Sequence, residues 1–221
     1  MKKPVQRPKL VLASKSPRRR YLLQQAGIEF SVVPSEFDEN SAQQSSPDTY
    51  VKFLAESKAL DIAQKYPDSW IVGADTIVLI DDTILGKPAG AEQARAMLKR
   101  LSGRTHRVLT GYCICHKNKA CFFSDTVTTQ VHFKELSQAE IDWYIGSGEP
   151  FDKAGAYAIQ GIGTVLVERV NGSYTNVVGL PVCEVFDFLI KHGVIDLTTE
   201  DRCQRSAVRP VAGQNYSRSD Q

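Results

Sequence analysis

The sequence predicts a mixed α/β protein whose sheet is partly antiparallel. Hydrophobic patterns typical of strands and of helices alternate along residues 9–192. Two long runs rich in β-branched and aromatic residues, 107–115 and 121–133, are separated only by a short polar turn, which favours an antiparallel hairpin. The chain has 221 residues, of which 42% are hydrophobic and 24% charged, and its mean hydropathy is -0.25. These values are ordinary for a soluble globular protein and exclude collagen-like, disordered and membrane-spanning chains.

Serine–proline pairs mark the two helices expected in the first third of the chain. At Ser16-Pro17 and Ser46-Pro47 the serine can cap a helix, and proline suits the first turn because its missing amide hydrogen would have no partner there. The expected segments are a strand at 9–13, a helix at 17–26 that stops at Gly27, a strand at 30–33 and a helix from 47 to about 66.

Strands and helices alternate in the same way after the second helix. Apolar runs at 70–74 and 77–80 predict strands that lead into a turn at Asp81-Asp82. Ser137 and Glu140 have the spacing of a capping box, which predicts a helix start. The other expected elements are a helix at 91–101, the two hairpin strands, a helix from 138 to about 145, a strand at 161–170 and a closing helix at 181–192.

The two ends of the chain differ from the region between them. Residues 1–8 form a basic extension, and residues 198–221 are rich in Arg, Ser, Gln and Asp, so we expect a disordered tail after a domain spanning 9–197. The apolar run at 10–13 is too short for a signal peptide or a membrane helix. Five irregularly spaced cysteines indicate reduced thiols and a cytoplasmic location. A net charge of +2 does not favour nucleic-acid binding.

The first strand-to-helix junction combines hydroxyls with cations. Ser14 and Ser16 precede a helix start that carries Arg18 and Arg19. A helix N-terminus offers unpaired amide hydrogens and a positive dipole end, so arginines there suggest that an anionic ligand such as phosphate compensates them. The alternative is a surface helix with a solvated basic turn.

Two groups of carboxylates are candidates for chemistry. Glu36, Asp38 and Glu39 follow the second strand and could bind Mg²⁺ or Mn²⁺, although such acidic loops are more often simply solvated. Asp75 interrupts an apolar run, where an acid is costly unless it is paired, bound to metal or used in catalysis. We therefore favour a functional role for Asp75.

Three lysines stand beside small or turn residues, namely Lys58, Lys87 and Lys153. Each alone is more simply a surface lysine, but together with the arginines they could offset the charge of a nucleoside triphosphate. Gln160 follows, and its amide could bind a base edge through both donor and acceptor.

The histidines and the cysteines give weaker signals. Cys113, Cys115, Cys121 and His116 do not have a usual zinc spacing, so we expect strand thiols there. His106 and His132 lie in strand patterns and are expected to be structural.

Taken together, these segments resemble the Maf family of nucleoside triphosphate pyrophosphatases. The resemblance covers roughly residues 10–192 and rests on six motifs in order: Leu12-Ala13-Ser14-Lys15-Ser16-Pro17-Arg18-Arg19, Glu56-Ser57-Lys58-Ala59, Gly73-Ala74-Asp75-Thr76, Leu85-Gly86-Lys87-Pro88, Asp152-Lys153-Ala154-Gly155-Ala156-Tyr157 with Ile159-Gln160-Gly161, and Val178-Gly179-Leu180-Pro181. No single motif is decisive, but six in this order form a specific signature. Lys15 departs from the family pattern, in which small residues are more usual between the two serines.

The resemblance implies a Maf-type, ITPase-like fold, in which helices flank a mixed twisted sheet and two lobes surround a nucleotide cleft. It also implies a homodimer that hydrolyses a nucleoside triphosphate to the monophosphate and pyrophosphate with a divalent cation. No nucleic-acid or membrane partner is expected.

Residue roles carried over from the family follow the same motifs. Asp75 is expected to be the proton acceptor, a metal ligand with Glu39, or both. Ser14, Arg19, Lys58, Lys87 and Lys153 are expected to bind the phosphates. Arg18, Thr76 and Gln160 match the dTTP/UTP branch rather than the branch that acts on 7-methyl-GTP. The expected role is the removal of dTTP, UTP or modified pyrimidine nucleotides from the nucleotide pool. The alternative functions are a nucleotide-binding regulator of cell division without essential turnover and a 7-methyl-GTP pyrophosphatase.

Overall fold

The computed structural model describes residues 9–42 and 45–197. The predicted basic extension 1–8 and tail 198–221 lie outside this part of the chain. The elements in chain order are β1 (Leu10–Leu12), α1 (Pro17–Gln25), β2 (Ser31–Val32), η1 (Glu39–Ser41), α2 (Pro47–Lys65), β3 (Trp70–Ile80), β4 (Thr83–Leu85), α3 (Ala91–Leu101), β5 (Thr105–His116), β6 (Cys121–Phe133), α4 (Gln138–Gly146), η2 (Glu149–Asp152), η3 (Ala154–Ala156), η4 (Gly161–Leu166), β7 (Val167–Asn171), α5 (Tyr174–Val178) and α6 (Val182–Lys191). The η elements are short 3₁₀ helices.

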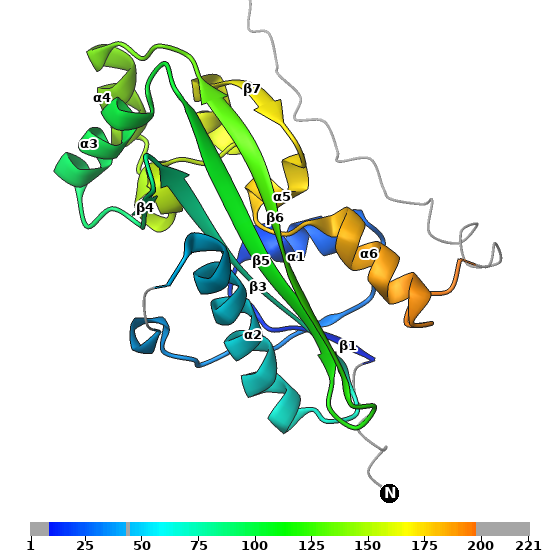
Figure 1. Ribbon diagram of the computed structural model, residues 1–221. Coiled ribbons are helices and arrows are strands. Elements are labelled where there is room, and N and C mark those ends of the chain that lie inside the picture. Colours follow the sequence, from blue (N-terminus) through cyan, green and yellow to red (C-terminus); the bar gives the residue numbers. More distant parts are fainter. Residues whose placement is uncertain (1–8, 43–44, 198–221) are drawn as a thin grey trace, which may run out of the picture.

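In the described part of the chain, one mixed sheet of seven strands organises the fold. The sequence predicts such a mixed, partly antiparallel sheet. Its order is β2-β1-β3-β5-β6-β7, and β4 pairs with β3 beside that path. β1 runs parallel to β2 and β3, whereas the pairs from β3 to β7 are antiparallel. The long strands β3, β5 and β6 cross the molecule diagonally in Figure 1.

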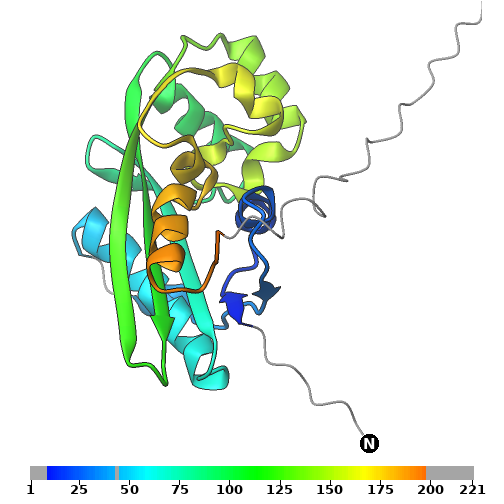
Figure 2. The ribbon, with the colours of Figure 1, turned by 90° about the vertical axis from the view of Figure 1, so that its right-hand side faces the viewer.

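Alternating side chains bury the two faces of the sheet under different helices. Ile71 of β3 and Cys113 of β5 pack with Ala59 of α2 on one face. On the other face, Val72 of β3 packs in a cluster that includes residues of α1 and α6. Figure 2 shows the same layers, with α2 on one side of the long strands and α1 and α6 on the other. A separate apolar cluster under α3 and α4 covers the far end of β3 and β5.

Capping residues set the helix starts at the predicted positions. The hydroxyls of Ser16, Ser46 and Ser137 each accept a hydrogen bond from an amide in the first turn of α1, α2 and α4, and Ser137 with Glu140 forms the predicted capping box. Helix α3 has the predicted bounds.

The expectation of two separate strands at 70–74 and 77–80 is wrong. Asp75 and Thr76 do not interrupt β3, because they pair with Gly111 and Thr110 across the ladder to β5. The turn at Asp81-Asp82 is present, with φ of 49° and 57°, and it leads into β4, which the sequence analysis missed.

The expectation of a strand over residues 161–170 is also wrong for its first part. Residues 161–166 form η4, and only Val167–Asn171 form a strand. The amides of Ile162 and Gly163 donate to the side chain of Glu149 instead of to a strand. Helix α5 after the turn at Gly172 was not predicted.

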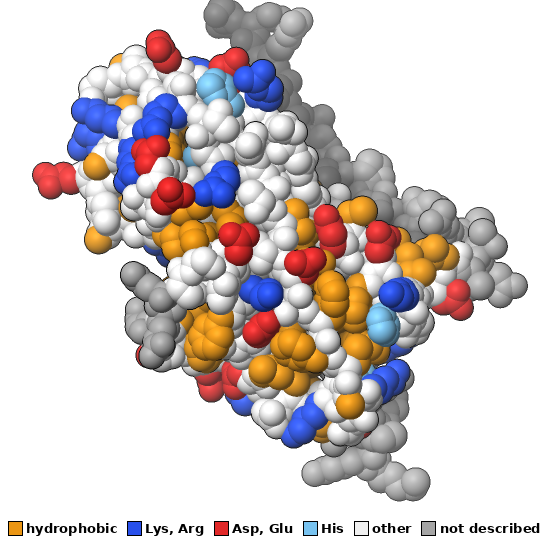
Figure 3. All heavy atoms as spheres, viewed as in Figure 1, with side chains coloured by type: hydrophobic (Ala, Val, Ile, Leu, Met, Phe, Trp, Pro, Cys, Tyr) orange, Lys and Arg blue, Asp and Glu red, His pale blue; other side chains and the backbone are white. Residues whose placement is uncertain are grey.

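Charges of both signs are interspersed over the face of the molecule shown in Figure 3, in keeping with the small net charge. None of the helices in the described part of the chain has the length and apolar character needed to span a membrane.

Candidate active site

A gap in the pairing of β3 opens onto a cavity. β1 pairs with β3 only as far as Val72, and β4 begins to pair at Val78. Between these points the edge of β3 is open toward a cavity of about 630 Å³. Because the edge is open, side chains from both faces of β3 reach the cavity, Asp75 from one face and Thr76 from the other.

All ten residues that the sequence singled out for the site line this one cavity: Ser14, Arg18, Arg19, Glu39, Lys58, Asp75, Thr76, Lys87, Lys153 and Gln160. They come from the β1–α1 loop and the start of α1, from η1, α2 and β3, and from the loops that follow β4, η2 and η3. These residues are spread over almost 150 positions of the sequence. The fold brings them together at one cavity, which the separate motifs do not reveal.

Lys58 of α2 connects the two carboxylates of the cavity. Its Nζ lies 2.5 Å from Asp75 Oδ1 and 2.7 Å from Glu39 Oε1. The side chains of Lys58 and Asp75 are 11% and 13% exposed, whereas that of Glu39 is 56% exposed. Burial raises the pKa of Glu39, but the hydrogen bond and charge of Lys58, with the charges of Lys87 and Arg19, outweigh burial and hold that pKa below its ordinary value.

Two glycines allow α2 to lie close enough for this contact. A Cβ at Gly73 of β3 would lie 2.4 Å from the carbonyl oxygen of Ala55 in α2. A Cβ at Gly111 of β5 would lie 2.4 Å from the carbonyl oxygen of Val51. The absence of side chains at these positions therefore sets the distance between the helix and the sheet, and with it the distance between Lys58 and Asp75.

Arg19 ties α1 to the floor of the cavity. Its Nε donates to Gly179 O at 2.6 Å, and its two terminal nitrogens donate to Ser14 Oγ at 3.2 Å and to Thr76 Oγ1 at 3.0 Å. Burial lowers the pKa of the Arg19 guanidinium, and the charge of Asp75 opposes that effect. Thr76 is accordingly a bonded part of the cavity floor.

Lys87 and Lys153 lie on loops around the cavity, and Arg18 lies in the first turn of α1. Lys153 donates from Nζ to Glu149 O at 2.7 Å and pairs with Asp152 Oδ1 at 2.5 Å, and Arg18 contacts Asp152 Oδ2 at 3.4 Å. Lys87 is exposed. The Gly155 amide donates to the Gly86 carbonyl at 3.0 Å and so links the loops that carry Lys87 and Lys153.

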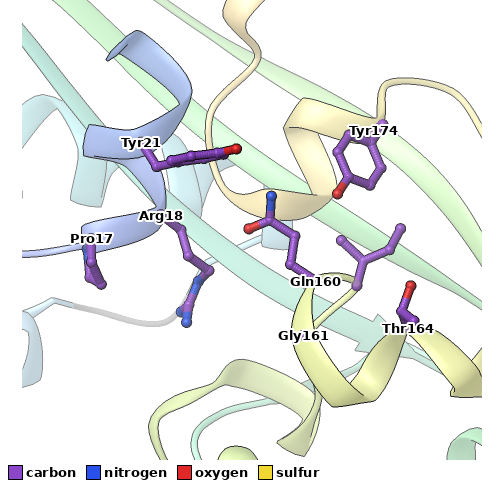
Figure 4. A pocket seen from close by; sticks show the side chains of 8 residues that line it. Pro17, Arg18, Tyr21, Gln160, Gly161, Thr164 and Tyr174 are labelled. Atoms are coloured by element: carbon purple, nitrogen blue, oxygen red, sulfur yellow. The ribbon is translucent and has the colours of Figure 1, made fainter. Parts of the chain in front are cut away.

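A second, open hollow adjoins the cavity at Arg18 and Gln160, which line both. Figure 4 shows Gln160 between Tyr21 of α1 and Tyr174 of α5, with Thr164 beside them. The two tyrosines are about half exposed, at 50% and 47%. The sequence analysis did not select them, and aromatic residues near a strand–helix turn give no distinct signal.

Several other residues that hold the site were also missed. Thr110 Oγ1 lies 2.9 Å from Thr76 Oγ1 and donates to Asn176 O at 2.9 Å. Asp152 pairs with both Arg18 and Lys153, and its position beside Lys153 was the one signal available. Thr110 lies in a strand with no local feature that distinguishes it.

The acidic loop contributes one carboxylate to the centre of the site. Glu39 reaches Lys58, whereas Glu36 pairs with Lys65 of α2 at 3.7 Å. Within residues 9–42 and 45–197, no group of three or more His, Cys, Asp or Glu side chains is arranged to hold a metal ion. The protein itself thus offers two hard oxygen donors at this point, Asp75 and Glu39.

The cysteines and histidines in the described part of the chain do not line the cavity. Cys113 and Cys115 are buried thiols of β5, and Cys121 is half-buried, as expected of strand residues. His106 is buried, its Nε2 lies 2.7 Å from the hydroxyl of Tyr157, and burial lowers its pKa to about 4.

Comparison with known proteins gives one family and many relatives. Residues 9–192 match the family described as Maf-like protein. A protein of Syntrophus aciditrophicus named dTTP/UTP pyrophosphatase is 49% identical over 181 residues, which are 82% of this chain and 88% of that protein. Proteins of the same name from Syntrophotalea carbinolica and Geotalea uraniireducens are each 48% identical, over 87% and 85% of this chain and 89% and 96% of their own lengths.

Proposed function

The chain belongs to the Maf family, and from that premise we propose that it hydrolyses dTTP and UTP to the monophosphate and pyrophosphate. The relatives that it matches at 48–49% identity carry this activity in their names. The observation that carries the proposal for this chain is the convergence of Asp75, Glu39 and six cationic side chains on one cavity. A triphosphate needs such compensating charge, and its hydrolysis needs a base.

The cations bind and orient the triphosphate. Lys87 and Lys153 on the loops and Arg18 at the start of α1 are close enough to the cavity to neutralise phosphate oxygens. Ser14 adds a hydroxyl, and the N-terminus of α1 adds the positive end of the helix dipole. These groups also stabilise the charge that develops on the departing pyrophosphate.

Asp75 accepts a proton from the attacking water. Its carboxylate is nearly buried, and the ammonium of Lys58 holds it by a hydrogen bond from the α2 side. A carboxylate fixed at the floor of the cavity is able to take the proton as the water oxygen bonds to the α-phosphorus and the bond to the pyrophosphate oxygen breaks.

The donor set fits a magnesium or manganese ion that arrives with the nucleotide. Mg²⁺ is usually bound through one or two carboxylates together with substrate phosphates, and Asp75 and Glu39 are two carboxylates that contact the same Lys58 nitrogen. A cation bound there supplies positive charge to the phosphate oxygens and lowers the pKa of water. In its absence Lys58 partly neutralises both acids.

The base occupies the hollow beside Gln160. The amide of Gln160 presents one donor and one acceptor to a pyrimidine edge, and Arg18 lies at the junction with the phosphate-binding cavity. The exposed rings of Tyr21 and Tyr174 provide apolar surface for the base on either side.

We further propose a homodimer that acts in the cytoplasm, as the family resemblance implies. Cys113, Cys115, Cys121 and Cys183 are free thiols, which suits a reducing compartment. Light scattering at several concentrations tests the oligomeric state, and a mass of one chain at all of them would contradict the dimer.

The substrate is tested by pyrophosphate release from UTP, dTTP, CTP, GTP and 7-methyl-GTP, with Mg²⁺ or Mn²⁺ and with a chelator. We expect metal-dependent release that is fastest with UTP and dTTP. Preference for 7-methyl-GTP would retain the chemistry and overturn the assignment of the base. Nucleotide binding without release from any of them would favour the regulator of cell division instead.

The site of attack is tested by hydrolysis of UTP in ¹⁸O-labelled water. Attack at the α-phosphorus places the label in the monophosphate. Label in the pyrophosphate would contradict the proposed geometry of the reaction.

A further inference from the structure

A half-buried carboxylate outside the cavity is bonded to the loop that carries Gln160. Glu149 begins η2 and does not line either hollow. Its Oε1 accepts from Tyr144 Oη at 2.9 Å and from the Gly163 amide at 2.9 Å, and its Oε2 accepts from the Ile162 amide at 3.0 Å. Burial raises the pKa of Glu149, but these hydrogen bonds and the charge of Lys153 outweigh it and lower the pKa, so the group is an anionic acceptor.

Tyr144 bonds the end of the Gln160 loop that Glu149 does not reach, at residue 158. Its side chain is fully buried, and its hydroxyl accepts from the Ala158 amide at 3.2 Å while donating to Glu149. The pair therefore bonds the backbone at residue 158 and again at 162 and 163. Gln160 lies midway between these points.

The loop fits closely against the pair. Gly161 has φ +76°, and a Cβ there would lie 2.5 Å from Glu149 Oε2. A Cβ at Gly163 would lie 2.7 Å from the hydroxyl of Tyr144. The turn around Gln160 is thus shaped on the Glu149 carboxylate, and this contact replaces the strand that the sequence predicted.

Glu149 also reaches the phosphate side of the cavity through its backbone. Its carbonyl oxygen accepts from Lys153 Nζ at 2.7 Å. One residue therefore fixes the loop of Gln160 through its side chain and the ammonium of Lys153 through its main chain.

We propose that Glu149 is a positioning residue that sets base selectivity by holding Gln160, without touching the nucleotide. The consequence for selectivity rests on the proposed function, in which Gln160 binds the base edge. The holding of the loop does not rest on it, because it follows from the contacts of the protein alone. A displacement of about 1 Å in a positioned group is enough to lower activity by large factors.

The test compares Glu149→Ala and Glu149→Gln with the wild type in two measurements. Glutamine keeps the shape and one acceptor oxygen but loses the charge, so its effects should be intermediate. The matched control is Glu135→Ala, which removes an exposed carboxylate whose side chain lies beside Gly103.

The first measurement is amide hydrogen exchange in the absence of nucleotide. In Glu149→Ala we expect the amides of Ile162 and Gly163 to exchange at least tenfold faster, while the buried strand amide of Leu109 stays within twofold. Unchanged exchange at 162 and 163 would overturn the proposal, whether or not the protein is an enzyme.

The second measurement is the ratio of kcat/KM for UTP to that for GTP. We expect the ratio to fall at least tenfold in Glu149→Ala, mainly through a higher KM for UTP, and to change less than twofold in Glu135→Ala. A folded Glu149→Ala protein with wild-type selectivity would show a merely structural role. If the wild type itself released no pyrophosphate, the proposed function would fail while the exchange result still decided whether Glu149 holds the loop.

Discussion

The ammonium of Lys58 lies 2.5 Å from the carboxylate of Asp75, and the same nitrogen lies 2.7 Å from Glu39. This contact joins a helix to the strand at the open edge of the sheet. It holds the carboxylates of Asp75 and Glu39 to one ammonium group in the cavity.

Replacing Lys58 by methionine should raise the pKa of Glu39. Its hydrogen bond and charge are the largest of the effects that lower this pKa, so burial would dominate without them. Titration of the glutamate carboxyl carbons by NMR measures the change. Lys52→Met on the same helix should leave the pKa of Glu39 unchanged. An unchanged pKa of Glu39 in Lys58→Met would contradict this account.

The same pair makes stability depend on pH in a defined direction. The pKa of Glu39 is lower in the folded protein than in the unfolded chain. Its ionised carboxylate therefore adds to the free energy of unfolding at a pH above the pKa of the unfolded chain. This contribution is lost as the pH falls through the pKa of the folded protein. In urea unfolding between pH 3 and pH 7, the free energy of unfolding should therefore fall more steeply toward acid pH in the wild type than in Lys58→Met. If the free energy of unfolding had the same pH dependence in both proteins, Lys58 would not be the cause of the lowered pKa of Glu39.

Arg19→Lys should destabilise the protein by about 2 kcal/mol, since a lysine cannot reproduce the three bonds of the guanidinium to Gly179, Ser14 and Thr76. Arg20→Lys, its exposed neighbour, should change stability by less than about 0.5 kcal/mol. Urea unfolding of both variants gives the comparison. Similar stabilities for the two would mean that the bonds of Arg19 contribute little.

Gly111→Ala should both destabilise and inactivate the protein. The new methyl group would meet the backbone of α2 at Val51, and overpacking of this kind costs about 1–3 kcal/mol. Moving α2 away from the sheet also separates Lys58 from Asp75. Gly90→Ala, where a methyl group would meet nothing within 4 Å, serves as the control. Wild-type UTP hydrolysis in Gly111→Ala would show that the close approach is unnecessary.

Gln160→Ala should lower the preference for UTP over GTP by about 5- to 150-fold, because the variant removes two hydrogen bonds to the base edge that are each worth about 0.5–1.5 kcal/mol. Tyr174→Ala should instead weaken the binding of all nucleotides alike, because about 1–3 kcal/mol of base stacking is lost. Values of kcat/KM for both nucleotides separate the two effects. Loss of preference in the tyrosine variant alone would reverse these roles.

Much of the fold could be predicted from local signals. Ser16-Pro17 and Ser46-Pro47 mark helix starts because capping and proline chemistry act within one turn. The continuity of β3 through Asp75 could not be predicted, because its pairing partner Gly111 is 36 positions away in sequence. Residues 161–166 have a strand-like composition, but the amides of Ile162 and Gly163 donate to the carboxylate of Glu149 instead of to a neighbouring strand.

The candidate site was predicted as a set of residues and not as an arrangement. The resemblance singled out Asp75 and Lys58, but their direct contact depends on α2 lying over a glycine of β3. Tyr174 and Glu149 lack any pattern of their own, since their relation to Gln160 exists only in the folded chain.

The role of Asp75 is tested most directly by its replacement with asparagine. Asparagine has nearly the same shape and keeps an oxygen that accepts from Lys58, but it cannot take a proton from water. Two quantities are compared with the wild type in protein shown to be folded by circular dichroism: kcat for UTP, and the Kd of the non-hydrolysable analogue α,β-imido-UTP. We predict that kcat falls by about 10³-fold or more, within the range of general-base catalysis, while Kd changes by less than about threefold. A kcat within tenfold of the wild type, or a Kd weakened as much as kcat, would contradict the account.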